Sequence, residues 1–209
     1  MSISGAGICV RPWHRECYSS DVSQSSIAPR LLIAMPQLMD PHFHRAVVLL
    51  VHHDCDGTFG LVLNRATEIT APTLCEMLSI DWRGDPSWAI DWGGPVQPET
   101  GWLLFDRADV PSEGSDEGVQ PIEDGLCLAG SIDTLRRVAS DPPQKTRVLL
   151  GYAGWGPGQL EGELSEGAWI TAPVSMNVVF GIEACDMWEH VVRGLGIEPA
   201  TLISTRGIH

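Results

Sequence analysis

Residues 146–173, TRVLLGYAGWGPGQLEGELSEGAWITAP, constrain the fold more than any other part of this chain. The aliphatic run Val148–Tyr152 predicts a strand, and a glycine-rich turn follows it at once. The acidic segment Gln159–Glu166 predicts a short helix, and the apolar residues beyond it predict a second strand. Helix and strand signals this close together are typical of a domain that mixes both kinds of element.

The glycine-rich turn has two interpretations. A strand, a glycine loop and a helix in succession can hold an anion on free backbone N–H groups. Here Pro157 lacks an N–H, Trp155 fills space that a phosphate would need, and the spacing matches neither G-x-G-x-x-G nor a Walker A loop. We therefore favour a tight, closely packed joint between strand and helix, with Pro157 at the first helical position.

The acidic helix after the turn carries Gln159, Glu161, Glu163 and Glu166. Glu163 and Glu166 are separated by three positions, so a helix can aim both carboxylates at one point. Such a pair can transfer protons or bind a metal ion. Acids in a first helical turn more often complement the helix dipole, and this is the structural alternative.

The rest of the folded part predicts a series of short strands and helices. Asp54–Gly57 contains the residues that a tight turn needs, so the strands on either side are expected to form an antiparallel hairpin. Val47–Val51 and Phe59–Leu63 lack alternation, which indicates that both faces of the sheet are covered. Glu99–Asp124 is acidic and holds Pro and Gly, so most of it is expected to be an exposed loop. The expected strands are Leu31–Met35, Phe43–His53, Thr58–Asn64, Trp88–Trp92, Trp102–Phe105 and Leu126–Ala129, and the expected helices are Thr73–Leu78, the segment from a Ser131 cap to about Ala139, and a last helix Glu183–Leu195.

Length and composition fit one domain of residues 29–209 after an N-terminal tail of residues 1–28. The tail is polar and serine-rich, and we interpret it as disordered rather than as a targeting peptide, because Glu16 and Asp21 oppose a transit signal. The longest aliphatic run is too short for a bilayer, so no membrane association is expected. The six cysteines match no zinc or disulfide framework and are interpreted as reduced thiols in a cytoplasmic protein.

The net charge of −14, from 27 acids against 13 Lys and Arg, disfavours direct DNA binding. No cofactor motif is present, and no nucleophile elbow is found. His42, His44, His52 and His53 suggest a metal until geometry is considered: on one strand, His42 and His52 would lie ~33 Å apart at ~3.3 Å per residue. We therefore predict neither a metal site nor a cofactor.

Four stretches occur in this order: LLIAMPQLMDPHFHRAVVLLVHHDCDGTFGLVLNRAT, GGPVQPETGWLLF, LLGYAGWGPGQLEGELSEGAWITAP and MWEHVVRGLGI. Together they resemble the YqgE/AlgH family. The resemblance implies an α+β fold with a mixed, largely antiparallel sheet that includes a small closed barrel and is surrounded by short helices. The family is mostly bacterial and cytosolic, its biochemical activity is not established, and the transcriptional-regulator label of some members arose from a phenotype.

Among the family's recurrent positions, the polar ones are the candidates for function: Arg45, Asn64, Gln159, Glu161 and Glu163. The first hypothesis is a non-enzymatic regulatory or adaptor protein that acts through protein contacts. The alternative is an enzyme of unassigned class, which requires these residues to converge in one cleft. Direct DNA binding is the third hypothesis, and the negative charge makes it the weakest.

Overall fold

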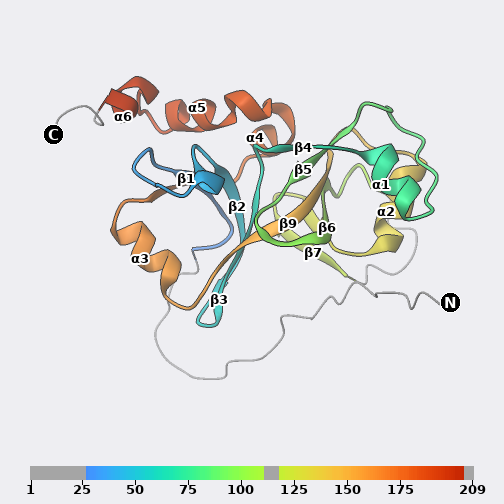
Figure 1. Cartoon of the computed structure of the whole chain (residues 1–209), viewed down its shortest axis with the longest axis horizontal. Helices are drawn as coiled ribbons and strands as arrows, with labels where there is room; N and C mark the ends of the chain where they lie inside the picture. The colour runs from blue at the N-terminus through green and yellow to red at the C-terminus, as the bar shows by residue number, and fades with distance from the viewer. Residues whose placement is uncertain (1–26, 111–117, 205–209) are drawn as a thin grey trace.

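The computed structural model describes residues 27–110 and 118–204, and its centre is one curled ten-stranded sheet (Figure 1). The predicted tail therefore lies outside the described residues, apart from its last two positions. The strands are β1 (Arg30–Ala34), β2 (Val47–Asp54), β3 (Gly57–Val62), β4 (Ala66–Thr70), β5 (Ala89–Trp92), β6 (Val96–Asp106), β7 (Val119–Glu123), β8 (Leu126–Ala129), β9 (Thr146–Trp155) and β10 (Trp169–Ala172). The helices are the 3₁₀ turn η1 (Pro41–Phe43), α1 (Ala71–Met77), α2 (Ile132–Ser140), α3 (Gln159–Ser165), α4 (Met176–Gly181), α5 (Ala184–Gly194) and α6 (Pro199–Ser204).

β9 joins the two halves of the sheet. Around Leu149 it pairs with β5 on one side and with β6 on the other. Residues 153–155 pair with β3, and the sheet continues from there through β2 and β1 to β10. Gly94 and Gly151 permit a close backbone approach at this junction, because a Cβ on Gly94 would lie 2.1 Å from the carbonyl carbon of Tyr152.

The sheet is a curled, open half-barrel. In the described part of the chain β10 pairs with β1 alone and β7 with β8 alone, so the two end strands do not meet. A closed barrel requires hydrogen bonds between its first and last strands. Pro121 in β7 lacks an N–H, which suits an edge strand. The predicted small closed barrel is therefore wrong, whereas the α+β class with a largely antiparallel sheet and short helices is confirmed.

Three apolar clusters account for the layers. The largest includes side chains from both halves of the sheet, and α4 and α5 cover it with Val179, Trp188 and Val192. A second cluster lies on the other face of β1, β2 and β3, under α3. A third lies on the other face of β6, β8 and β9, under α1 and α2. Figure 1 accordingly shows α1 and α2 at one end of the molecule and α5 and α6 at the other.

Several sequence predictions are confirmed at the level of elements. β2 and β3 form the hairpin around residues 54–57, and residues 47–51 and 59–63 are buried on both faces. The strand Leu126–Ala129 is β8 with the predicted bounds. Ser131 is the N-cap of α2, where its side chain accepts a hydrogen bond from the Thr134 N–H. Cys75 and Cys127 are buried, Cys55 and Cys185 are exposed, and Cys9 and Cys17 lie outside the described residues.

Other predictions need correction. The second strand begins at Val47 rather than Phe43, because Asp40 caps the turn η1 and Arg45 has a left-handed backbone with φ of 52°. The acidic stretch expected as a loop contributes the end of β6 and the whole of β7. The predicted last helix is α5, and α6 follows it. No helix in the two described ranges is long and apolar enough to cross a membrane.

Candidate functional site

The glycine-rich turn is a self-contained joint between β9 and α3. The Gly156 N–H donates to the side-chain oxygen of Gln159 at 3.1 Å, and the Gln159 N–H donates back to the Gly156 carbonyl at 3.1 Å. Gly158 occupies the N-cap with φ of 74°, so α3 begins at Gln159 and the prediction that Pro157 is its first residue is wrong. Trp155 is buried against the adjacent core. The turn therefore uses its own polar groups to close the joint.

The Glu163 carboxylate binds three side-chain donors. Its Oε2 accepts hydrogen bonds from the indole N–H of Trp155 at 3.0 Å and from that of Trp169 at 2.7 Å. Its Oε1 accepts one from the Gln159 amide at 2.8 Å. Phe43 contacts both indoles, with ring centroids 6.1 Å from Trp155 and 5.6 Å from Trp169. Glu163 thus links α3 to β9 and β10, and Glu166 of the predicted carboxylate pair is exposed at the end of α3.

Glu161 faces the β2–β3 hairpin. Its Oε1 lies 3.6 Å from Nε2 of His53, whose Nδ1 is 2.7 Å from the Thr58 hydroxyl oxygen. A hydroxyl, an imidazole and a carboxylate therefore stand in one row, an order that also occurs in nucleophilic enzymes. No sequence motif points to Thr58, and His53 stands out in the sequence only as a possible metal ligand, because the pairing across the hairpin brings the two residues together. Thr58 is 7% exposed, so its hydroxyl is shielded from a substrate.

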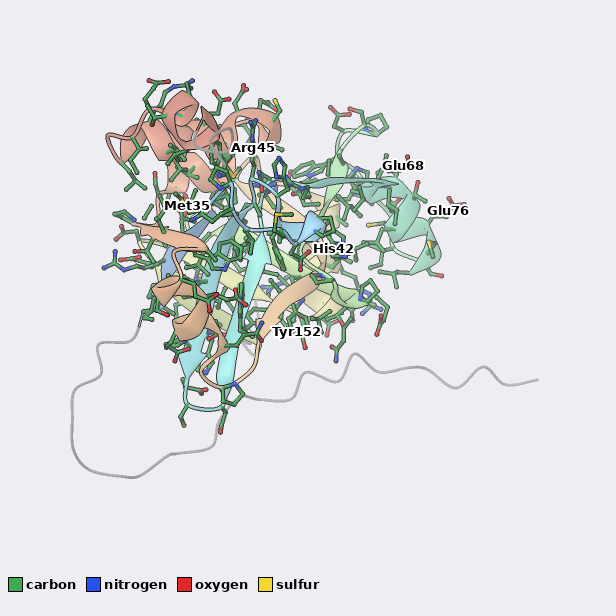
Figure 2. All side chains as sticks on the ribbon, turned by 60° about the vertical axis from the view of Figure 1, so that its left-hand side comes forward. Met35, His42, Arg45, Glu68, Glu76 and Tyr152 are labelled. Carbon is green, nitrogen blue, oxygen red and sulfur yellow. The ribbon has the colours of Figure 1, made fainter. Side chains whose placement is uncertain are left out.

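Asn64 and Arg45 form a second group at the other end of β2. The Asn64 side chain accepts from the Val47 N–H at 2.9 Å and donates to the Arg45 carbonyl at 2.9 Å. These two bonds hold the left-handed backbone of Arg45. The Arg45 guanidinium then lies 5.3 Å from the ring centroid of Trp188 on α5, a cation–π distance. Figure 2 shows Arg45 beside the α5 end of the molecule.

The structure thus gathers the five candidates into separate sets. Gln159 and Glu163 share a hydrogen bond, Asn64 binds the backbone of Arg45, and Glu161 faces His53. No hydrogen bond or ion pair within residues 27–110 and 118–204 joins the α3 residues to Arg45 or Asn64.

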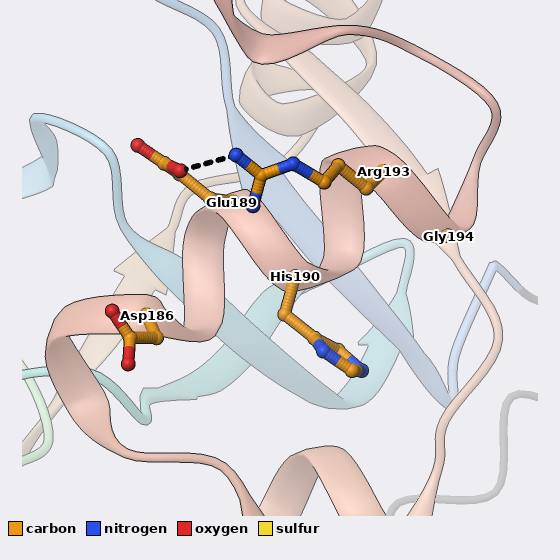
Figure 3. A pocket seen from close by; sticks show the side chains of 5 residues that line it. All are labelled: Asp186, Glu189, His190, Arg193 and Gly194. Carbon is orange, nitrogen blue, oxygen red and sulfur yellow. Dashed lines mark hydrogen bonds and ion pairs between the residues drawn. The ribbon is translucent and has the colours of Figure 1, made fainter.

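Two surface hollows in the described part of the chain are lined by none of the five candidates. One, of about 430 Å³, is on α5, where Glu189 and Arg193 form an ion pair at 2.8 Å (Figure 3). The other, of about 350 Å³, lies between Arg107 and the β7–β8 hairpin. Among the described residues, no three His, Cys, Asp or Glu side chains are grouped so that they would hold a metal ion. His52 instead bonds Asp54 at 2.7 Å.

A partly buried ion pair joins Arg147 of β9 to Asp91 of β5, and no sequence motif predicts it. The Arg147 Nε donates to Asp91 at 2.8 Å, and the rest of its guanidinium donates to the carbonyls of Val179 and Leu63. Burial raises the pKa of Asp91 above its usual value, and the Arg147 hydrogen bond and charge oppose that rise. The sequence contains one sign of this pair, a single Arg within an otherwise uncharged strand. The pair ties β5 and β9 to α4 and to Leu63, the residue that follows β3.

The comparisons with known proteins agree with this fold over nearly the whole chain. The model of the AlgH-like family matches residues 31–200. A UPF0301 protein of Myxococcus xanthus is 38% identical over 185 residues, which cover 88% of this chain and 99% of that protein. A UPF0301 protein of Magnetococcus marinus is 35% identical over 181 residues, which cover 86% of this chain and 94% of that protein.

Two solved structures extend the comparison. The solution structure of the AlgH protein from Pseudomonas aeruginosa matches with a TM-score of 0.69 and 32% identity, covering 91% of this chain and 100% of that chain. A crystal structure of a Corynebacterium diphtheriae protein at 22% identity and a TM-score of 0.65, covering 83% of this chain and 88% of that chain, supports the fold alone. The predicted resemblance is confirmed, and the chain belongs to the AlgH-like family.

Proposed function

We propose that this protein is a non-enzymatic regulatory or adaptor protein that acts in the cytoplasm through contacts with other proteins. The observation that carries the proposal is that the candidate polar groups form hydrogen bonds within the fold. Asn64 and Glu163 are held by neighbours of their own, and neither surface hollow is lined by any of the five candidates. Catalytic groups must reach one substrate together, so this arrangement favours binding over chemistry.

The charge of the chain supports a protein partner over nucleic acid. With a formal net charge of −14, the molecule repels phosphate backbones and attracts basic protein surfaces. A regulatory effect on transcription, as some family members are labelled, would then arise through a protein partner rather than through direct DNA binding.

The alternative, an enzyme of unassigned class, has one observation in its favour, the row of Thr58, His53 and Glu161. Its geometry resembles a nucleophile, a base and an orienting acid. The shielded hydroxyl and the absence of these residues from both hollows weaken it. If this row is a hydrolytic site, the purified protein hydrolyses a model ester, and His53→Ala abolishes that hydrolysis. If the unchanged protein does not hydrolyse the ester, the row is excluded as an esterase site.

The adaptor function is tested by photo-crosslinking in the cells that produce the protein. Benzoyl-phenylalanine is placed at exposed positions on every side of the molecule, and the captured proteins are identified by mass spectrometry. We expect one protein to be captured reproducibly, and less of it when crosslinking is repeated in a lysate at high ionic strength, because the surface is acidic. Failure to capture any reproducible protein from all positions contradicts the adaptor function.

A further inference from the structure

The corner where β4 passes into α1 exposes an unusual amount of apolar side chain. Of the five large apolar residues exposed within the described ranges, three lie here: Ile69 at 37%, Met77 at 76% and Leu78 at 36%. Behind them Leu74, Ile80, Trp82 and Trp88 are partly buried against the core cluster under α1 and α2. Exposed apolar side chains in the same segment as residues that pack on a core cluster are more typical of a contact site than of scattered surface residues.

Acidic side chains surround this corner. Glu68 and Glu76 are exposed and form no ion pair with any described residue. Two hydrogen bonds from Ser87 lower the pKa of Asp85, so this carboxylate is ionised at neutral pH. Arg83 is the one Lys or Arg within residues 68–88, and it is paired with Asp81 at 3.2 Å. Figure 2 shows Glu68 and Glu76 on the same side of the molecule, at the right of the view.

We propose that this corner, residues 68–88, docks a basic amphipathic segment of a partner protein. The aliphatic side chains of the segment pack on Met77 and Leu78, and its Lys or Arg residues lie beside Glu68 and Glu76. The inference rests on the proposed adaptor function and names the surface and the partner chemistry that serve it. Apolar contact supplies the affinity, and the acidic surround supplies the rate of association and the selectivity.

Charge also decides against other occupants. A second copy of the chain placed on the corner by two-fold symmetry brings the same carboxylates against each other, and like charges at a contact are unfavourable. An anionic membrane surface repels the same carboxylates. A basic segment is the occupant that neutralises them while it covers the apolar side chains.

The test uses two synthetic peptides of Lys and Leu with the same composition. In one the leucines share a helical face, and in the other they are scrambled around the helix. The full-length protein is labelled with ¹⁵N, and its amide spectrum is followed during titration with each peptide. We expect the amphipathic peptide to shift the resonances of residues 68–88 and to bind about tenfold more tightly than the scrambled one, because only it presents one apolar face.

Matched variants separate the corner from the general charge of the surface. Met77→Gln should weaken the amphipathic peptide about tenfold, whereas Met39→Gln, at the same exposure of 76%, should leave its affinity unchanged. Glu76→Gln should weaken binding more than Glu198→Gln, which removes an equal charge elsewhere. Folding of each variant is checked from the dispersion of its amide spectrum.

The results distinguish this inference from the adaptor function. Shifts centred on another face, or equal losses from Met39→Gln and Met77→Gln, overturn the corner as a docking surface. A cellular partner crosslinked only at positions outside residues 68–88 also overturns it, and the adaptor function stands. Self-association that Met77→Gln abolishes would replace the basic segment with a second copy of the chain.

Discussion

At the scale of single residues, polar side chains that the sequence marks as candidates for function have structural roles. The Asn64 side chain satisfies two backbone groups at the start of β2, because it accepts a hydrogen bond from the Val47 N–H and donates one to the Arg45 carbonyl. Glu163 satisfies two buried indole N–H groups that would otherwise lack a partner in the core. A chain can therefore retain Asn64 and Glu163 for the fold alone, and their chemistry alone does not argue for catalysis.

A swap of Gln159 and Glu163 tests this structural role. All three side chains around Glu163 donate N–H groups to it. In Glu163→Gln the amide NH₂ faces one of these donors, so one hydrogen bond is lost, and the unfolding free energy should fall by about 1–2 kcal/mol. Adding Gln159→Glu restores every bond: residue 163 keeps an oxygen for both indoles, and residue 159 accepts from it and from the Gly156 N–H.

Urea unfolding of the two single variants and the double variant measures the coupling between these positions. We expect the double variant to recover most of the stability that Glu163→Gln loses. If the two losses simply add, the hydrogen-bond network does not hold α3 on the sheet.

At the scale of elements, sequence patterns located most segments and failed where a single backbone feature decided the boundary. The β2–β3 hairpin follows from its turn residues and unbroken aliphatic runs, and the Ser131 cap sets the start of α2. The start of β2 was misplaced because the turn η1 and the left-handed Arg45 interrupt an apparently continuous run. The acidic segment around β7 forms a strand because it pairs with β8, and local propensity does not encode such tertiary pairing.

Some contacts of the candidate site follow from local sequence, and others depend on tertiary structure. The contact between Gln159 and Glu163 follows from helical spacing, since the two are four positions apart. The contacts between Asn64 and Arg45, and between Glu161 and His53, depend on which strands and helices lie side by side. The open half-barrel likewise depends on whether the end strands meet, and local sequence does not specify that meeting.

The junction of β6 and β9 carries a prediction about pH. Asp106 at the end of β6 pairs with Lys145, just before β9, at 2.7 Å. The Lys145 hydrogen bond, followed by the Ala108 N–H, lowers the pKa of Asp106 below 3.8, its usual value. Because the folded pKa is lower than the unfolded one, the stabilisation is complete above pH 3.8 and is lost as the pH falls through the folded pKa.

Asp106→Asn should therefore lower the unfolding free energy at pH 5–7, and the difference from the unchanged protein should shrink below pH 3.8. Asparagine keeps an oxygen for the Ala108 N–H, so the variant isolates the charge pair. Asp133→Asn, which removes an exposed pair with Arg136, serves as the control and should change stability less. A difference that stays constant from pH 7 to pH 2.5 contradicts this assignment.

At the scale of the whole molecule, charge and topology act together. The half-barrel leaves β4, β7 and β10 as edge strands in the described part of the sheet, and exposed edges favour association between chains. A net charge of −14 opposes that association between identical molecules and leaves basic partners free to approach. The same acidity therefore protects the open sheet and selects the kind of partner that the β4–α1 corner is proposed to bind.

This acidity has a measurable cost in stability. Like charges repel each other more in the compact state than in the unfolded chain. Raising NaCl from 10 to 150 mM shortens the Debye length from about 30 to about 8 Å, so the melting temperature should rise, by about 2–8 °C if screening returns about 1–2 kcal/mol. The opposing loss from screened surface ion pairs, such as Arg193 with Glu189, is small because exposed pairs contribute little.

Scanning calorimetry across this salt range measures the effect, and a variant with Glu99→Gln and Glu123→Gln supplies the comparison. Both residues are exposed, so the variant removes two like charges and leaves the core unchanged. Its melting temperature should be higher at 10 mM NaCl and should rise less on addition of salt. Sucrose, which acts without screening, should stabilise both proteins equally. Equal salt responses of the two proteins would show that the cost does not come from like-charge repulsion.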